Sequence, residues 1–152
     1  SDTKARSDDI QDFLRPCAPS RDPAYLAWRE AKIRSALAAD LSEPEKAIPL
    51  EKIWKKYGLE IKFSGRAEAD LDAIHDYIAR HNEAAAERVI QRILQAVAVL
   101  ENFPLLGRDG SVDGTREFPI ARLPYFVVYR IVDEAQLRVL TIMHTARQYP
   151  PS

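Results

Sequence analysis

Two segments near the C-terminal end of this chain would present apolar side chains on both faces if they formed strands. We predict them as Tyr125–Val132 and Gln136–Thr145, joined by a tight hairpin at Asp133-Glu134-Ala135. An antiparallel sheet with one face in water should alternate apolar and polar residues along each strand. These segments do not alternate in that way, so we expect other parts of the chain to cover both faces of the sheet.

A pair of predicted helices can cover one of these faces. Ser64 is a suitable N-cap for the first helix, and Asn82, in the turn His81-Asn82, is suitable for the second. The second helix is expected to stop before Pro104, because proline cannot continue a helix. The apolar stripes are Ala67, Leu71, Ile74 and Ile78 in the first helix and Val89, Ile90, Ile93, Leu94, Val97, Leu100 and Phe103 in the second. Two such helices form an antiparallel hairpin, with Asp70, Asp72 and Asp76 expected on a solvated face.

The remaining strands complete an α+β domain of order β-α-α-β-β-β with an antiparallel sheet. Leu59–Phe63 alternates apolar and polar residues before the helical hairpin. Thr115–Arg122 is the predicted strand after it. The stretch from Gly107 to Gly114 contains three glycines and no periodicity, so we expect a loop there.

The second face of the sheet has its cover in the N-terminal third of the chain. Residues 1–23 are polar and are expected to be poorly ordered. Asp22 and Pro23 then begin an amphipathic helix that ends at Ser42-Glu43-Pro44, and a second short helix is predicted from Leu50 to Tyr57, ending at Gly58. The first helix carries its apolar stripe at Leu26, Ile33, Leu37 and Leu41. The residues expected to dock this two-helix arm are Tyr25, Leu26, Trp28, Ile33, Leu37, Ile48, Leu50, Ile53, Trp54 and Tyr57.

Composition excludes several classes of function. No apolar run is long enough to cross a bilayer, and the first residues lack a signal region, so a cytoplasmic protein is expected. Cys17 is the single cysteine, and the three histidines are widely spaced, so we expect neither a metal site nor a cofactor. Up to Gly58 there are 11 basic and 10 acidic residues, and after it 11 basic and 13 acidic. Direct binding of DNA is therefore not expected.

One group of polar residues could support acid–base chemistry. His144, Arg147 and Tyr149 follow the end of the last strand, and Arg116, Arg122 and Arg130 could add contacts to a phosphate. Histidine moves protons at neutral pH, and arginine stabilises the negative charge that develops during phosphodiester cleavage. The alternative is that His144 and Arg147 are structural residues at the sheet edge. We favour this alternative, because Lys62 is the only lysine after Gly58.

Four sequence motifs, in this order, resemble a known family of bacterial proteins. They are Arg66-Ala67-Glu68-Ala69-Asp70-Leu71, Phe103-Pro104-Leu105-Leu106-Gly107-Arg108, Tyr125-Phe126-Val127-Val128-Tyr129-Arg130 and Met143-His144-Thr145-Ala146-Arg147. From Ile61 to Tyr149 the chain resembles the ParE branch of the RelE/ParE toxins of toxin–antitoxin modules. The resemblance implies a RelE/ParE-like fold and a toxin that inhibits DNA gyrase by binding. Phe126 stands where the RNase branch tends to carry a basic residue.

The N-terminal arm resembles an antitoxin. Residues 22–58 are similar to the toxin-binding segment of a ParD/PaaA-like antitoxin, which divides the chain into 1–23, an arm at 24–58 and a toxin domain at 59–152. The resemblance implies a toxin neutralised in cis, with Arg116, Arg122, Arg130, His144 and Arg147 as candidates for target binding. Two alternatives stay open: a ribosome-dependent messenger RNase that uses His144, Arg147, Tyr149 and Arg122, and a regulatory complex without toxicity. The sequence also leaves open a homo-oligomer and whether the join is natural or engineered.

Overall fold

The computed structural model describes residues 19–42, 48–49 and 59–147, and its centre is a mixed six-stranded sheet. The strands are β1 (Ile48–Pro49), β2 (Glu60–Phe63), β3 (Arg108–Asp109), β4 (Arg116–Pro119), β5 (Tyr125–Ile131) and β6 (Gln136–His144). Their order across the sheet is β1-β2-β6-β5-β4-β3. All neighbouring pairs are antiparallel except β2 and β6, which are parallel. The expectation of an antiparallel sheet is therefore wrong at this pair, because the intervening elements return the chain to lie beside β2 in the same direction.

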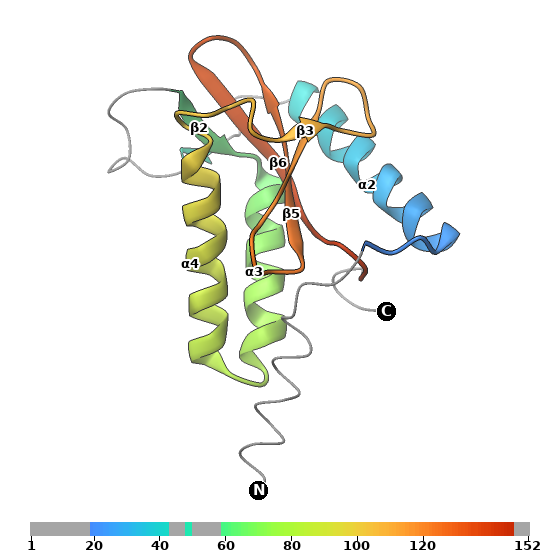
Figure 1. Cartoon of the computed structure of the whole chain (residues 1–152), viewed down its shortest axis with the longest axis vertical. Helices are drawn as coiled ribbons and strands as arrows, with labels where there is room; N and C mark the ends of the chain where they lie inside the picture. Colours follow the sequence, from blue (N-terminus) through green and yellow to red (C-terminus); the bar gives the residue numbers. More distant parts are fainter. Residues whose placement is uncertain (1–18, 43–47, 50–58, 148–152) are drawn as a thin grey trace, which may run out of the picture.

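The helical hairpin consists of α3 (Gly65–Ala79) and α4 (Glu83–Val99), which lie together on one side of β5 and β6 (Figure 1). Both predicted caps are confirmed. The Ser64 hydroxyl accepts a hydrogen bond from the Ala67 amide and donates one to the Leu140 carbonyl, which ties the start of α3 to β6. The Asn82 side chain accepts from the Ala85 amide at the start of α4.

The first core lies between this hairpin and the sheet. Its centre is formed by Ile74 and Ile78 of α3 and by Ile93 and Val97 of α4, all fully buried or nearly so. From the sheet, the alternate residues Tyr125, Val127 and Tyr129 of β5 belong to this core. Leu137, Val139 and Ile142 of β6 belong to it as well, and the step of three residues from Val139 to Ile142 follows from a register shift in the pairing with β5. The predicted apolar stripes of the two helices thus pack as expected, with one exception. Phe103 lies beyond the end of α4 and is 62% exposed, because α4 ends at Val99.

The second face of the sheet is covered by α2 (Pro23–Ser42), which lies on the side of β5 and β6 opposite the hairpin (Figure 1). Fully buried Ile33 and Ala36 of α2 pack against Phe126, Val128, Leu140 and Met143 of the sheet. Trp28 and Leu37 are partly buried at the edge of this cluster. Both faces of β5 and β6 are therefore covered, as the lack of alternation required.

Several details differ from the sequence-based expectations. Leu26 and Leu41, assigned to the apolar stripe of the first helix, are 46% and 58% exposed, because α2 turns a narrower face to the sheet. The expected loop from Gly107 to Gly114 contains β3, which pairs with β4. The strand predicted at Thr115–Arg122 is the shorter β4, and Arg122 adopts a left-handed conformation with φ 68°. The predicted helix Leu50–Tyr57, with its docking residues, lies outside the described residues, as do residues 1–18.

Candidate functional site

The face of the sheet under α2 has an apolar centre surrounded by polar contacts. At one end of α2, the Tyr25 hydroxyl donates to the His144 carbonyl oxygen at 2.5 Å, and the Ser20 amide donates to the Thr145 carbonyl at 3.0 Å. At the other end, Asp40 reaches Arg138, near the beginning of β6. The helix therefore runs antiparallel to β6, and its direction is fixed by contacts at both of its ends.

Arg29 anchors the first half of α2 to β4. Its Nη2 atom lies 2.5 Å from Oε1 of Glu117, whose side chain is only 3% exposed. Its Nη1 atom donates to the Ser111 hydroxyl at 3.0 Å, and its guanidinium lies 4.8 Å from the centre of the Phe126 ring. A buried carboxylate requires a charged or hydrogen-bonding partner. Glu117 has three such partners: Arg29 of α2, the Ser111 amide, which donates a hydrogen bond at 3.2 Å, and Arg108 at a longer distance of 3.5 Å.

Lys32 anchors the opposite flank of α2 to the helical hairpin. Its ammonium lies 2.9 Å from Oδ1 of Asp70 on α3. The other oxygen of Asp70 accepts hydrogen bonds from the Thr141 hydroxyl and, at 3.1 Å, from the Ile142 amide. The expectation that Asp70 belongs to a solvated helix face is therefore wrong: this carboxylate joins α2, α3 and β6. Asp72 and Asp76 are exposed, as expected.

Asp40 anchors the last turns of α2 to two arginines. Its Oδ2 atom lies 2.8 Å from Nε of Arg130, and its Oδ1 atom lies 3.6 Å from Nη1 of Arg138. Arg130 and Arg138 are directly opposite each other on β5 and β6. The side chain of Asp40 is 2% exposed, and among the residues that the structure describes the two guanidinium groups are its ion-pair partners.

The predicted acid–base residues lie at the far end of β6. His144 is buried, with its ring edge against Tyr125, and its Nδ1 atom accepts a hydrogen bond from the Ala146 amide at 2.9 Å. Burial, with a smaller contribution from the charge of Arg147, lowers the pKa of His144 to about 4. The ring is therefore neutral at pH 7, so the positively charged form that acts as a general acid is not populated in this state. Arg122 and Arg147 are exposed near this end, and Tyr149 lies outside the described residues.

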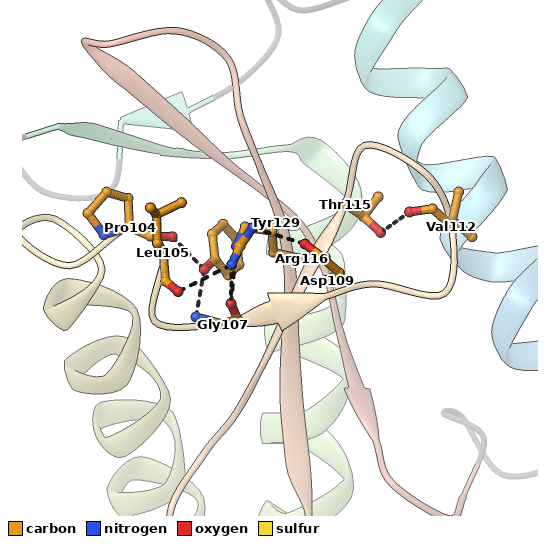
Figure 2. A network of polar contacts seen from close by, with 8 residues as sticks. All are labelled: Pro104, Leu105, Gly107, Asp109, Val112, Thr115, Arg116 and Tyr129. Carbon is orange, nitrogen blue, oxygen red and sulfur yellow. Dashed lines mark hydrogen bonds and ion pairs between the residues drawn. The ribbon is translucent and has the colours of Figure 1, made fainter.

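Arg116 is engaged in a different network, next to the apolar core (Figure 2). Its guanidinium donates to the Gly107 carbonyl at 3.1 and 2.6 Å and to the Leu105 carbonyl at 3.2 Å, and it pairs with Asp109. In the same network the Tyr129 hydroxyl donates to the Pro104 carbonyl at 2.6 Å and accepts from the Gly107 amide at 3.0 Å. These bonds satisfy the backbone of the connection between α4 and β4, so Arg116 has a structural role there.

The predicted site residues thus fall into three places: Arg130 under α2, His144 with Arg122 and Arg147 at the end of β6, and Arg116 beside α4. Four charged residues that take part in the ion pairs between α2 and the rest of the domain were not predicted: Asp40, Asp70, Glu117 and Arg138. One signal could have found Asp40, because it follows Ile33 and Ala36 at i+7 and i+4 on the buried side of the helix. Arg138 similarly stands between the apolar residues Leu137 and Val139 of a mostly apolar strand.

Neither a metal site nor a membrane span is found in the part of the chain that the structure describes. No group of three or more histidine, cysteine, aspartate or glutamate side chains there could hold a metal ion. Among the described helices, none has both the length and the apolar character needed to cross a bilayer.

Comparisons with known proteins match somewhat more than half of this chain. Residues 61–149 match the family described as the ParE toxin of the type II toxin–antitoxin system parDE. The putative toxin Y4kP of Sinorhizobium fredii is 40% identical over 90 residues, which cover 59% of this chain and 92% of the relative. Toxin RelE2 of Caulobacter vibrioides is 33% identical over 88 residues, which cover 58% and 97%. A solved structure, the chromosomal ParDE TA system from P. aeruginosa, matches with a TM-score of 0.52 and 28% identity, over 57% of this chain and 95% of that one.

Proposed function

This chain belongs to the ParE toxin family, and on that premise we propose that its toxin domain inhibits DNA gyrase and is neutralised by the N-terminal segment that contains α2. In this proposal the toxin domain is residues 59–152. The protein is a toxin of a ParDE/RelE-type toxin–antitoxin system, and such a toxin has an antitoxin as its partner. In this proposal, residues 24–58 take the part of that antitoxin within the same polypeptide.

The observation that carries the proposal is the way α2 is attached to the sheet. The helix precedes the matched residues 61–149 and adds an apolar cluster of its own to the domain. Three charged anchors surround this cluster: Arg29 on Glu117, Lys32 on Asp70, and Asp40 between Arg130 and Arg138. An apolar centre with complementary charges around it is the usual composition of an interface between two proteins.

Inhibition by binding agrees better with the geometry than RNA cleavage does. A nuclease that uses acid–base catalysis needs a group able to give up a proton and several converging cations. In this chain His144 is buried and neutral at pH 7, Arg116 is bonded to backbone carbonyls, and Arg130 is paired with Asp40. The toxin domain also has more acidic than basic residues, 13 against 11 after Gly58.

One observation favours a messenger RNase as the second candidate. The Thr145 amide donates to the Pro124 carbonyl at 2.9 Å, which brings the end of β6 beside the connection between β4 and β5. His144, Arg147 and Arg122 therefore gather at one end of the sheet. Release of the N-terminal segment would expose the His144 carbonyl there, because the Tyr25 hydroxyl that bonds to it would leave. This RNase would need no metal, and α2 would inhibit it through the same contacts.

The test compares the intact chain with toxin released in two ways. One is a fragment of residues 59–152, which keeps the bond between the Leu59 amide and the Glu101 carbonyl, together with β2. The other is the full chain with Ile33→Asp, which places a charge in the buried centre of the α2 interface and leaves the toxin domain unaltered. Both should slow bacterial growth at equal soluble levels, whereas the intact chain and a Leu26→Asp control, altered at an exposed position of the same helix, should not.

The target is identified with the same proteins in vitro. Released toxin should block supercoiling by gyrase and leave ribosome-bound messenger intact. Messenger cleavage that disappears in His144→Ala or Arg147→Ala would instead establish the RNase. Equal growth with intact and released forms would contradict neutralisation by α2.

A further inference from the structure

Two arginines stand directly opposite each other under the end of α2. Arg130 of β5 and Arg138 of β6 are register partners, and their side chains are only 15% and 7% exposed. Like charges directly opposite in an antiparallel pair repel each other and destabilise the sheet. Placing two guanidinium groups there is therefore unfavourable unless an anion lies between them.

In the structure that anion is the carboxylate of Asp40. One of its oxygens faces the guanidinium of Arg130 at 2.8 Å and the other faces that of Arg138 at 3.6 Å. Arginine is the side chain best suited to bind a planar carboxylate, because its N–H groups match the spacing of the two oxygens. The two arginines thus form a receptor for one carboxylate, and Asp40 fills it.

The position of Asp40 is not explained by its own helix. It lies in the last turn of α2, where the helix dipole is negative and an acidic residue is unfavourable. No basic residue stands in that turn to compensate for it. The carboxylate is there because of the two arginines of the sheet.

From this arrangement we propose that Arg130 and Arg138 are the site at which the toxin domain binds an acidic side chain of its protein target, and that Asp40 occupies this site in the neutralised chain. The inference rests on the proposed function, because it requires α2 to leave the sheet before the target binds. It adds the chemistry that the target must present at this place.

The rest of the face distinguishes a protein carboxylate from a nucleic-acid phosphate. Val128 and Leu140 lie in the apolar cluster beside the two arginines, which suits an amphipathic segment rather than a polyanion. The carboxylates of Glu117 on β4 and of Asp70 on α3 also meet α2, and they would repel a phosphate backbone bound in its place. The complementary partner is therefore a protein segment with an acidic residue at one end, an apolar middle and basic residues at the other end, as α2 itself has.

The experiment uses the full chain with Ile33→Asp, in which α2 should leave the sheet and expose Arg130 and Arg138 while the toxin domain keeps its own sequence. The probe is a labelled peptide of residues 23–42, whose affinity is compared with that of the same peptide carrying Asp40→Asn. Loss of a charge-assisted contact should weaken binding by about tenfold or more. The difference between the two peptides should vanish when the protein also carries Arg130→Gln and Arg138→Gln. Arg92→Gln, at an exposed position of α4, is the matched control and should preserve the difference.

Gyrase assays with these proteins separate this inference from the proposed function. The released chain should inhibit supercoiling, and the double Gln variant should lose that inhibition. Inhibition retained in the double Gln variant would overturn the inference while leaving the proposed function intact. If no released form inhibits gyrase, the proposed function fails, and the peptide measurement still decides whether the arginines select a carboxylate. Equal binding of both peptides, or tighter arginine-dependent binding of a single-stranded oligonucleotide, would overturn the inference. Arg130→Lys with Arg138→Lys, which keeps both charges, serves if the Gln variant does not fold, and it should give an intermediate difference between the peptides.

Discussion

Replacing Ile33 by alanine should loosen α2 without unfolding the toxin domain. Ile33 is fully buried at the centre of the cluster formed by α2, β5 and β6. The substitution removes three carbon atoms, worth about 0.8 kcal/mol each in transfer from water. A cavity penalty is added to this, since the surroundings close only in part, and Ile→Ala substitutions cost roughly 2–5 kcal/mol in protein cores. We expect a loss of about 3 kcal/mol in the free energy that docks α2.

That loss corresponds to an increase of about a hundredfold in the population with α2 undocked, because each 1.4 kcal/mol is a factor of ten. Hydrogen exchange followed by mass spectrometry measures this population directly. Amides of α2 should exchange about a hundredfold faster in Ile33→Ala, and those of α3 and α4 should be unchanged. Growth of bacteria producing the variant should be slower in proportion to the undocked toxin.

Leu26→Ala is the control, because Leu26 lies on the same helix but is half exposed. Its effect should stay within about 0.5 kcal/mol, the usual range for surface substitutions. One result would refute the reasoning: if exchange in α3 and α4 accelerates as much as in α2, the helix is part of a single cooperative unit and not a separable arm.

Three further predictions concern other parts of the chain. Trp28→Ala should lower the melting temperature by less than Ile33→Ala, because the indole is only partly buried beside Tyr25, and Trp54→Ala, outside the described residues, is also expected to lower it. Tyr129→Phe should lower the free energy of unfolding by about 1–3 kcal/mol, because it leaves the Gly107 amide without its hydrogen-bond acceptor. Thermal unfolding measures this, and an unchanged melting temperature would show that this network adds no stability. Burial lowers the pKa of His144 from 6.5 to about 4, so the unfolded chain binds this proton first as the pH falls. The free energy of unfolding should therefore decrease from pH 6.5 towards pH 4, and it should decrease less steeply in His144→Gln.

Much of the fold could be predicted because the relevant signals are local. A cap such as Ser64 or Asn82 bonds to an amide three residues further along the chain, so the sequence alone predicts where α3 and α4 begin. Helical periodicity and turn residues act over the same short range. The lack of alternation in β5 and β6 also predicted a tertiary contact, because both faces of these strands must be covered. The helical hairpin covers one face, so the N-terminal segment was the remaining candidate to cover the other, where α2 packs.

The sequence predicted the candidate site less completely. Arg130 was selected as a candidate for target binding, but its partner Arg138 was not, because the two are separated by a hairpin and meet only through the register of β5 and β6. Asp70 was expected in solvent, because periodicity describes only its own helix. Its contacts with Lys32 and Thr141 come from elements far away in the sequence.

The sequence by itself determined α2, the helical hairpin and the strands β2, β4, β5 and β6, and that both faces of the central strands must be covered, but it did not predict the short strands β1 and β3. Only the tertiary structure decided which charges meet: Asp40 with Arg130 and Arg138, and Glu117 with Arg29. The physical reason is range. Capping and periodicity are written in neighbouring residues, whereas an ion pair depends on a distance of a few ångströms between side chains that only the packing of α2 on the sheet brings together.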